Sequence, residues 1–285
     1  MQREDHRLRL QALLRSPTEI DPVEAALAIA AEDDPAADVL GVRARIDAFA
    51  RTAAERAAGT GNPFRRLDAV NSVLFGDLGL RGEVGTYHDP ESSFLHRVLD
   101  RRRGIPLSLT LLFLEAARAA GFAGRVVALP GRAVARIDFD GRTLWVDPFD
   151  GGAPITPEDC RELVARRSGR PGLFRPELLE GAAPLDVVAR MLLNLKRAYL
   201  AREDYERALA AVERLILVRP RDAREIRDRG ILHGYLGQTG RAVFDLSQYL
   251  ELEPTAPDAA AVRGRLDRLL RRSEPAGRSG GGRLD

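Results

Sequence analysis

The sequence is poor in cysteine. Cys160 is the only cysteine among 285 residues, so neither a disulfide framework nor a cysteine-based zinc site can form within one chain. A lone thiol fits a reducing compartment, and we therefore expect a cytoplasmic protein. The four histidines are scattered at positions 6, 88, 96 and 233, and no close pattern of histidine and acidic residues joins them. The sequence therefore predicts no metal site and no cofactor.

Long hydrophobic runs are also missing. The longest run, near residues 105–117, is interrupted by Ser108, Thr110 and Glu115, and it is too short to cross a membrane. The first ten residues, MQREDHRLRL, are charged and lack the apolar centre of a signal peptide. We therefore expect no membrane partner.

Neither sign of charge dominates the chain. The formal net charge is +2 although the pI is near 9.0, and acidic and basic residues are interspersed. Lys196 is the only lysine, and a uniform preference for arginine is more typical of genome composition than of a binding code. No long basic run with interleaved aromatic side chains is present. These features argue against nucleic acid as the partner.

A packed core is expected, since 45% of all residues are hydrophobic. The first part of the chain is predicted to be helical. Residues 22–58 are rich in alanine and predict two helices. Asp21 can cap the first of them, with Pro22 at its first position. A further helix is expected over residues 64–78, ending at Gly79.

A buried helix is expected at the centre of the sequence. A helix before it begins at Asp89, a plausible cap, and is expected to stop at Gly104. Residues 105–121, IPLSLTLLFLEAARAAG, then predict a helix that is apolar on nearly every side until Glu115. A helix of this kind is buried in a globular protein.

Three strands are predicted after the buried helix, over residues 125–129, 133–137 and 143–147. Asp140-Gly141, between the last two strands, is typical of a two-residue hairpin turn. With that turn, Asp147 faces Val134 on the neighbouring strand.

A repeat with a period of 34 residues follows. The segments that begin at Asn194 and Asp228 align with small, charged and proline residues in register: Ala208 with Ala242, Arg207 with Arg241, and Pro220 with Pro254. A period of 34 with small residues where helices cross and a closing proline is typical of tetratricopeptide (TPR) repeats. An unrelated pair of helical hairpins is the alternative. Only two repeats are visible, with a capping helix expected at 256–271, so this region should dock on the rest of the protein.

These patterns predict an α+β protein in five parts. N-terminal helices precede a core in which a buried helix packs on a small antiparallel sheet, and an all-α TPR unit follows. The expected boundaries are an N-terminal helical segment at 1–62, the core at 63–165, a linker at 166–184, the TPR repeats with their capping helix at 185–271, and a flexible tail at 272–285.

The order of elements in the core is typical of papain-like and transglutaminase-like enzymes. There the nucleophilic cysteine lies at the start of the buried helix, where the helix dipole lowers the thiol pKa. The base histidine lies on one strand and the acid that orients it on the next. Five segments carry a closer resemblance: NSVLFGDLGLRG (71–82), DPESSFLHRVLDRRRGIPLSLTLLFLEAARAAG (89–121), LPG (129–131), VDPFDGG (146–152) and TPEDCREL (156–163). With these segments the sequence resembles the bacterial SirB-type family, a transglutaminase-like core followed by TPR repeats.

The resemblance implies that only one of three catalytic roles is kept. The position of the cysteine, about fifteen residues before Gly121, is occupied by Pro106, which has no nucleophile. The position after the LPG turn, where many family members keep a histidine, is occupied by Arg132, which cannot act as a base at neutral pH. Asp147 matches the acid. We therefore hypothesise that Arg132 and Asp147 form an ion pair across the hairpin; the alternative is that Arg132 points to solvent and Asp147 only caps the next turn.

Other side chains could supply a nucleophile or a base. Ser108 lies near the start of the buried helix, but a serine needs a base within hydrogen-bonding reach. His88 and His96 precede this helix, and His96 is expected to be a partly exposed helix residue. Cys160 is expected to be an ordinary buried residue. His233 occupies a TPR position usually filled by tyrosine, so core packing is expected there.

Two functions follow from these patterns. The first is a catalytically silent transglutaminase-like and TPR protein that acts as an interaction or regulatory module. Its partner would be a protein or peptide on the concave TPR face, with the groove of the former active site as a second surface. The alternative is a hydrolase or acyl transferase that uses Ser108 and a distant histidine.

Overall fold

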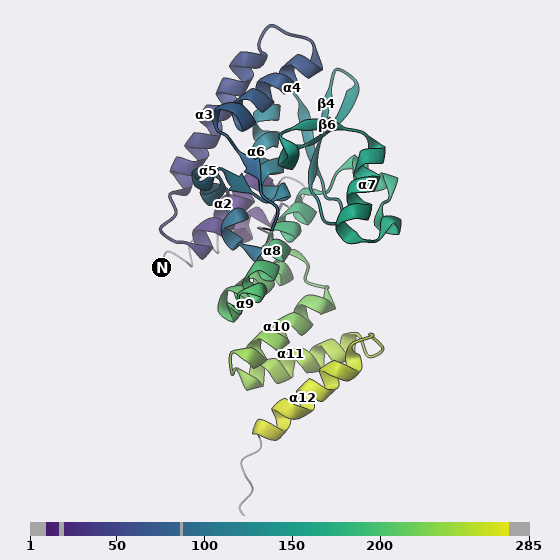
Figure 1. Ribbon diagram of the computed structural model, residues 1–285. Helices are drawn as coiled ribbons and strands as arrows, with labels where there is room; N and C mark the ends of the chain where they lie inside the picture. Colours follow the sequence, from purple (N-terminus) through teal and green to yellow (C-terminus); the bar gives the residue numbers. More distant parts are fainter. Residues whose placement is uncertain (1–9, 17–19, 86–87, 274–285) are drawn as a thin grey trace, which may run out of the picture. The chain divides into compact units, whose positions relative to one another are not determined.

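The computed structural model describes residues 10–16, 20–85 and 88–273, and is shown in Figure 1. The chain divides into two compact units, one up to Ala198 and one from Tyr199 onward, and each is described by itself. No helix among the described residues is long and apolar enough to cross a membrane.

Two helices form the N-terminal part of the first unit, as predicted: α2 (Pro22–Asp33) and α3 (Val39–Ala57). Asp21 caps α2, because its Oδ1 accepts hydrogen bonds from the backbone N–H groups of Val23 and Glu24 at 2.8 and 3.3 Å. The cap and the proline at the first helical position explain why the helix begins there.

The next helix differs from its prediction. α4 (Pro63–Asn71) is shorter than expected, and a π-helical segment, η1 (Ser72–Asp77), continues it. The wider turn is closed by the N–H of Leu78, which donates to the carbonyl of Val73 at 3.0 Å. Gly79, with φ of 64°, ends the segment as expected.

The helix predicted from Asp89 to Gly104 is divided in two. A 3₁₀ turn, η3 (Pro90–Ser92), comes first and is capped by Asp89, and α5 (Leu95–Arg101) follows. The stop is not at Gly104, because Arg102 already leaves the helix with φ of 60°.

Gly104 instead lies in a short strand, β2 (Arg103–Gly104), which pairs in parallel with β1 (Arg81–Gly82). A Cβ at Gly104 would lie 2.7 Å from Oγ of Ser108, so this backbone approaches the following helix too closely for a side chain. The glycine therefore serves close packing.

α6 (Pro106–Ala119) is the buried helix that the sequence predicts. Pro106 is its first residue, and Gly121 follows its end with φ of 91°. Leu112 and Phe113 have no exposed surface.

A four-stranded antiparallel sheet follows in the order β3-β4-β5-β6. The strands are β3 (Ala123–Val127), β4 (Val134–Phe139), β5 (Arg142–Asp147) and β6 (Ala153–Ile155), the last of which the sequence did not predict. Asp140 and Gly141 both have positive φ, at 50° and 73°, and Phe139 pairs with Arg142. The predicted turn and register are therefore confirmed.

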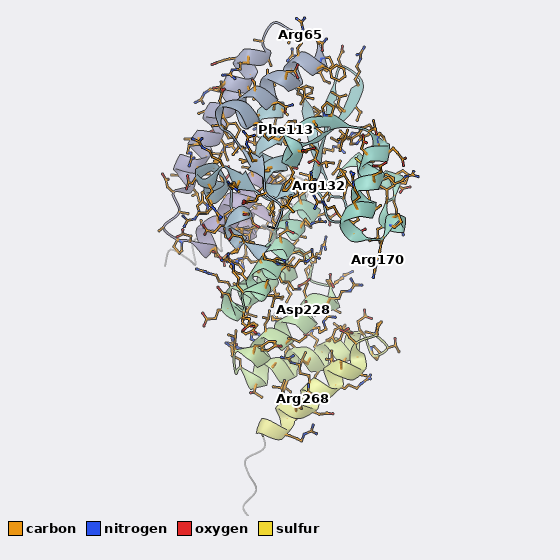
Figure 2. The ribbon with its side chains drawn as sticks, viewed as in Figure 1. Arg65, Phe113, Arg132, Arg170, Asp228 and Arg268 are labelled. Atoms are coloured by element: carbon orange, nitrogen blue, oxygen red, sulfur yellow. The ribbon has the colours of Figure 1, made fainter. Side chains whose placement is uncertain are left out.

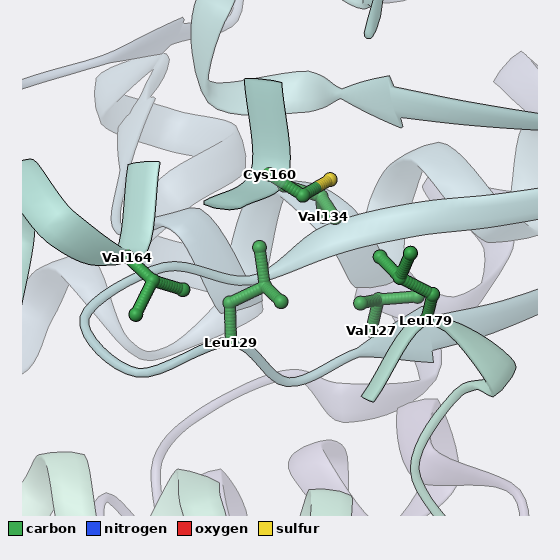
Figure 3. Close-up of a cluster of buried hydrophobic side chains, with 6 residues drawn as sticks. All are labelled: Val127, Leu129, Val134, Cys160, Val164 and Leu179. Carbon is green, nitrogen blue, oxygen red and sulfur yellow. The ribbon is translucent and has the colours of Figure 1, made fainter. Parts of the chain in front are cut away.

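Both faces of the sheet are covered at β4. α6 packs on one face, and α7 (Pro157–Ser168) contributes to a cluster on the other. This cluster contains Val127, Leu129, Val134, Cys160, Val164 and Leu179, and Figure 3 shows Cys160 beside Val134. Double coverage explains why Val134, Ala135 and Ile137 are all fully buried.

Two 3₁₀ turns, η5 (Pro171–Leu173) and η6 (Pro176–Glu180), occupy the segment predicted as a linker. Part of it packs on the sheet, since Leu179 is 7% exposed and its carbonyl accepts a hydrogen bond from Nε1 of Trp145 at 3.2 Å.

α8 carries the chain from the first unit into the second, which is entirely helical in the described residues (Figure 1). The helices from this point on are α8 (Pro184–Ala201), most of which lies in the first unit, and α9 (Tyr205–Val218), α10 (Ala223–Tyr235), α11 (Thr239–Leu252) and α12 (Ala259–Ser273) in the second. Ala208 and Ala242, equivalent in the 34-residue repeat, are both fully buried. A Cβ at Gly230 would lie 2.9 Å from atoms of Asp245 and Leu246, so α10 and α11 cross in close contact there.

Candidate functional site

Pro106 and Ser108 lie at the buried start of α6. Pro106 has no side-chain donor or nucleophile, and its carbonyl accepts a hydrogen bond from Oγ1 of Thr110 at 2.7 Å. Thr110 Oγ1 also lies 3.3 Å from the carbonyl oxygen of Ala133, just before β4. This contact ties the start of α6 to the strand that follows Arg132.

Arg132 and Asp147 form the ion pair hypothesised from the hairpin register. Nε and Nη2 of Arg132 donate to Oδ2 of Asp147 at 2.9 and 2.5 Å. Both residues are buried, with exposed fractions of 5% and 3%. The LPG turn positions Arg132, because the backbone N–H of Arg132 donates a hydrogen bond to the carbonyl of Leu129 at 3.1 Å. Arg132, labelled in Figure 2, is therefore held inside the first unit instead of pointing to solvent.

The other oxygen of Asp147 and the face of Arg132 also have partners. Oδ1 of Asp147 accepts a hydrogen bond from the N–H of Phe149 at 3.1 Å. The guanidinium carbon of Arg132 lies 4.2 Å from the centre of the Phe149 ring, a cation–π contact. A Cβ at Gly82 would lie 2.4 Å from this ring, so Gly82 leaves the space that Phe149 fills.

Segments far apart in the sequence meet at the same place. Asn71 donates from Nδ2 to the carbonyl of Gly152 at 2.9 Å, and a Cβ at Gly152 would clash with Asn71. Together with the contact between Gly82 and Phe149, this joins the segment 71–82 to the segment 146–152. These packing demands give a physical reason for the residue types in both motifs.

In the part of the chain that the structure describes, Ser108 has no base beside it. Its hydroxyl lies 2.8 Å from the carbonyl of Ser92 and 3.0 Å from that of Ile105, and no hydrogen bond to a histidine is found among the described residues. The cavity beside Ser108 measures about 20 Å³, which is room for about one water molecule. This cavity is too small to be the groove of the former active site that the sequence predicts as a second surface, and that groove stays a prediction.

A larger hollow of about 780 Å³ lies elsewhere in the first unit. Leu111, Glu115 and Arg118 of α6 line it, together with residues of β3 and residues 181–184. None of the four candidate positions, Pro106, Ser108, Arg132 and Asp147, contributes to its lining. This hollow is thus separate from the candidate site.

Cys160 is not a reactive thiol. It has no exposed surface and packs in the cluster of Figure 3. Burial raises the pKa of its thiol to about 12, so the thiolate is not populated at neutral pH. The expectation of an ordinary buried residue agrees with this environment.

The three described histidines lie in different environments. His88 is exposed, and His233 is buried in α10 with Nε2 3.7 Å from Oδ2 of Asp245, as core packing requires. His96 was expected to be partly exposed, which is wrong, because it is only 8% exposed. Neither ring nitrogen of His96 has a hydrogen-bond partner. Its place in α5, which packs on α2 and α3, explains the burial.

His96 should make the protein less stable in mild acid. Burial, aided by the charge of Arg97, lowers the pKa of His96 below its usual value. A histidine in the unfolded chain titrates near pH 6.5. Between the two pKa values the unfolded state binds more protons, so stability falls as the pH is lowered from about 6.5, by up to about 1.4 kcal/mol per pH unit.

Denaturant unfolding of the wild type and of His96→Leu, at pH 7.5 and at mildly acidic pH, measures this effect. We expect the variant to lose less stability on acidification than the wild type. An equal loss in both proteins would contradict the assignment to His96.

No group of three histidine, cysteine, aspartate or glutamate side chains is arranged to hold a metal ion in residues 10–16, 20–85 and 88–273. Of the four candidate positions, only Asp147 carries a carboxylate, and its oxygens are engaged by Arg132 and by the N–H of Phe149. The described residues there therefore do not form a metal site.

Comparisons with known proteins agree with this architecture. Residues 41–193 match the transglutaminase-like superfamily, and residues 195–267 match a tetratricopeptide repeat family. A UPF0162 protein of Xylella fastidiosa (strain Temecula1) is 33% identical over 204 residues, covering 70% of this chain and 73% of that protein. UPF0162 protein YchA of Escherichia coli (strain K12) and protein SirB1 of Salmonella typhimurium (strain LT2) are each 27% identical over 207 residues, covering 72% of this chain and 76% of each relative. No solved structure matches significantly.

Fold and matches together define a transglutaminase-like core joined to a TPR region. The chain belongs to the UPF0162/SirB1 family. The resemblance to the SirB-type family, stated from five short segments, is thereby confirmed.

Proposed function

We propose that this protein is a catalytically silent member of the transglutaminase-like superfamily that acts as an interaction or regulatory module. The observation that carries the proposal is the closed pair of Arg132 and Asp147. The position expected for the base holds an arginine whose guanidinium is bound to the position expected for the acid. Asp147, in this proposal, is the remaining catalytic acid, now in a structural role.

Three further features support a silent site. Pro106 stands where the nucleophile is expected, and the cavity beside Ser108 holds no more than about one water molecule. Ser108 bonds to backbone carbonyls, which cannot act as general bases at neutral pH. Among the described residues, the alternative, a hydrolase or acyl transferase based on Ser108, therefore lacks a hydrogen-bonded base of the kind that its chemistry requires.

The TPR region supports an interaction role, because TPR arrays present a concave surface to peptides or extended protein segments. We place the partner site on that surface, and a cytoplasmic location is part of the proposal. The partner is a protein or peptide, consistent with the balanced net charge of +2.

The proposal is tested by two readouts on the full chain. In the first, amide hydrolysis and transamidation are measured with a glutamine peptide and a primary amine. The wild type, Arg132→His and Ser108→Ala should all match buffer, because no thiolate or paired serine is present. A rate above buffer that Ser108→Ala abolishes would contradict a silent site.

In the second readout, a photo-reactive residue replaces Tyr235, which is 54% exposed on α10, in the native cell. We expect a discrete crosslinked product from this position and none from the same residue at exposed Arg51 of α3, the matched control. Absence of any crosslink from Tyr235 would count against an interaction role for this face.

A further inference from the structure

The face shared by α10 and α12 carries a pocket of about 280 Å³ within the second unit. α10 is the first helix of the second repeat, and α12 occupies the corresponding place 34 residues later. First helices of successive repeats line the binding surface of a TPR array. Five residues line the pocket: Gly234 and Tyr235 from α10, and Arg265, Arg268 and Leu269 from α12.

Tyr235 and Arg265 form an ordered aromatic and cationic wall. The ring of Tyr205 stacks on that of Tyr235, with the centroids 4.5 Å apart and the planes 7° apart. The guanidinium carbon of Arg265 lies over the Tyr235 ring at 4.5 Å. Nη2 of Arg265 also approaches the carbonyl of Ile231 at 3.5 Å. These contacts hold one guanidinium in place before any ligand arrives.

Within the described residues, no carboxylate compensates the positive charge of the pocket. No carboxylate lines it, and in the described residues neither Arg265 nor Arg268 forms an ion pair. Other arginines of the same unit are neutralised: Arg227 by Asp228 and Asp258, and Arg229 by Asp245. Arg268, labelled on α12 in Figure 2, is exposed and available to an anion.

We propose that this pocket binds a carboxylate of an acidic peptide segment of the partner, next to an apolar side chain. Two guanidinium groups match a carboxylate in charge and geometry. The ring of Tyr235 and the side chain of Leu269, which is 8% exposed, offer apolar contact beside them. The inference rests on the proposed function, because it names the chemistry of the partner that the TPR surface takes.

Binding of fluorescent synthetic peptides to the full-length protein tests the inference. The probe carries two glutamates flanked by leucines, and the matched probe has glutamine in place of both glutamates. We expect the acidic probe to bind at least about tenfold more tightly, and its affinity to fall as salt screens the charges. An amidated form of the acidic probe should bind equally well, and loss of binding on amidation would overturn the assignment to side-chain carboxylates of an acidic segment.

Arg265→Gln and Arg268→Gln should each lower the affinity for the acidic probe about five- to tenfold. Arg271→Gln, an exposed arginine of α12 outside the pocket, removes the same charge and should leave the affinity unchanged. Equal binding of the acidic and glutamine probes, or equal loss in all three variants, would overturn the inference. Tighter binding of a single-stranded oligonucleotide at the same arginines would also overturn it. The peptide experiment tests only whether the pocket selects a negatively charged ligand. The crosslinking and activity measurements test the proposed function independently of it.

Discussion

Arg132→Met is expected to lower the free energy of unfolding by about 3–5 kcal/mol, because it leaves the Asp147 carboxylate buried without its partner. Asp147 is 3% exposed, so water cannot replace the two hydrogen bonds from Arg132. The cation–π contact with Phe149 is lost as well. Equilibrium denaturation with urea measures the change.

Arg45→Met is the matched control. Arg45 pairs with Asp100 at 2.7 Å, but the two side chains are 49% and 54% exposed. Exposed pairs contribute little, so this variant should lose less than about 1 kcal/mol. Similar losses in the two variants would mean that burial of the Arg132 pair has no energetic consequence.

The fragment 184–285 is expected not to fold as a monomer with a cooperative transition. It contains α8, but part of α8 belongs to the first unit. Val187 contributes to the larger hollow, Met191 and Leu195 line the small cavity beside Ser108, and Arg190 donates to the carbonyl of Leu129 at 3.1 Å. Without the first unit these apolar side chains are exposed, and two repeats bury too little surface to compensate.

Thermal unfolding followed by circular dichroism, with sedimentation to determine the association state, tests this expectation. The full-length protein is the control and should unfold in a sharp transition. A fragment that is monomeric and unfolds with comparable sharpness would show that the TPR region needs no support from the first unit.

The hairpin could be predicted from the sequence because its determinants are local. Asp140-Gly141 requires positive φ at both positions, and this turn fixes which residues face each other. From the register followed the contact between Arg132 and Asp147. The repeat was equally accessible, since its period of 34 residues and its small residues recur in the sequence itself.

The π-helical segment after Asn71 and the early end of α5 could not be predicted in this way. Leu78 bonds to Val73 in a widened turn that no residue type specifies. Arg102 adopts a left-handed conformation that residue preference alone would assign to Gly104. At both positions tertiary contacts overrule the local pattern.

The sequence indicated which residues make up the candidate site but not which side chains surround them. Motif matching placed Pro106, Arg132 and Asp147, yet the closure of the site depends on Phe149 and Gly82, which lie far apart in sequence. The burial of His96 arises in the same way. The pocket of Tyr235 and Arg265 also lacked a sequence signal, because it joins residues from two helices that are not consecutive.

A double-mutant cycle of Arg132→Met and Asp147→Asn tests most directly whether the arginine has taken a structural role in the site that we propose to be silent. The amide oxygen introduced by Asp147→Asn can still accept the hydrogen bond from the N–H of Phe149, so the cycle isolates the ion pair. We predict a coupling energy of about 2–3 kcal/mol, well above that of the exposed pair of Arg45 and Asp100. A coupling energy indistinguishable from zero would contradict the account, because Arg132 would then merely occupy the position of a histidine.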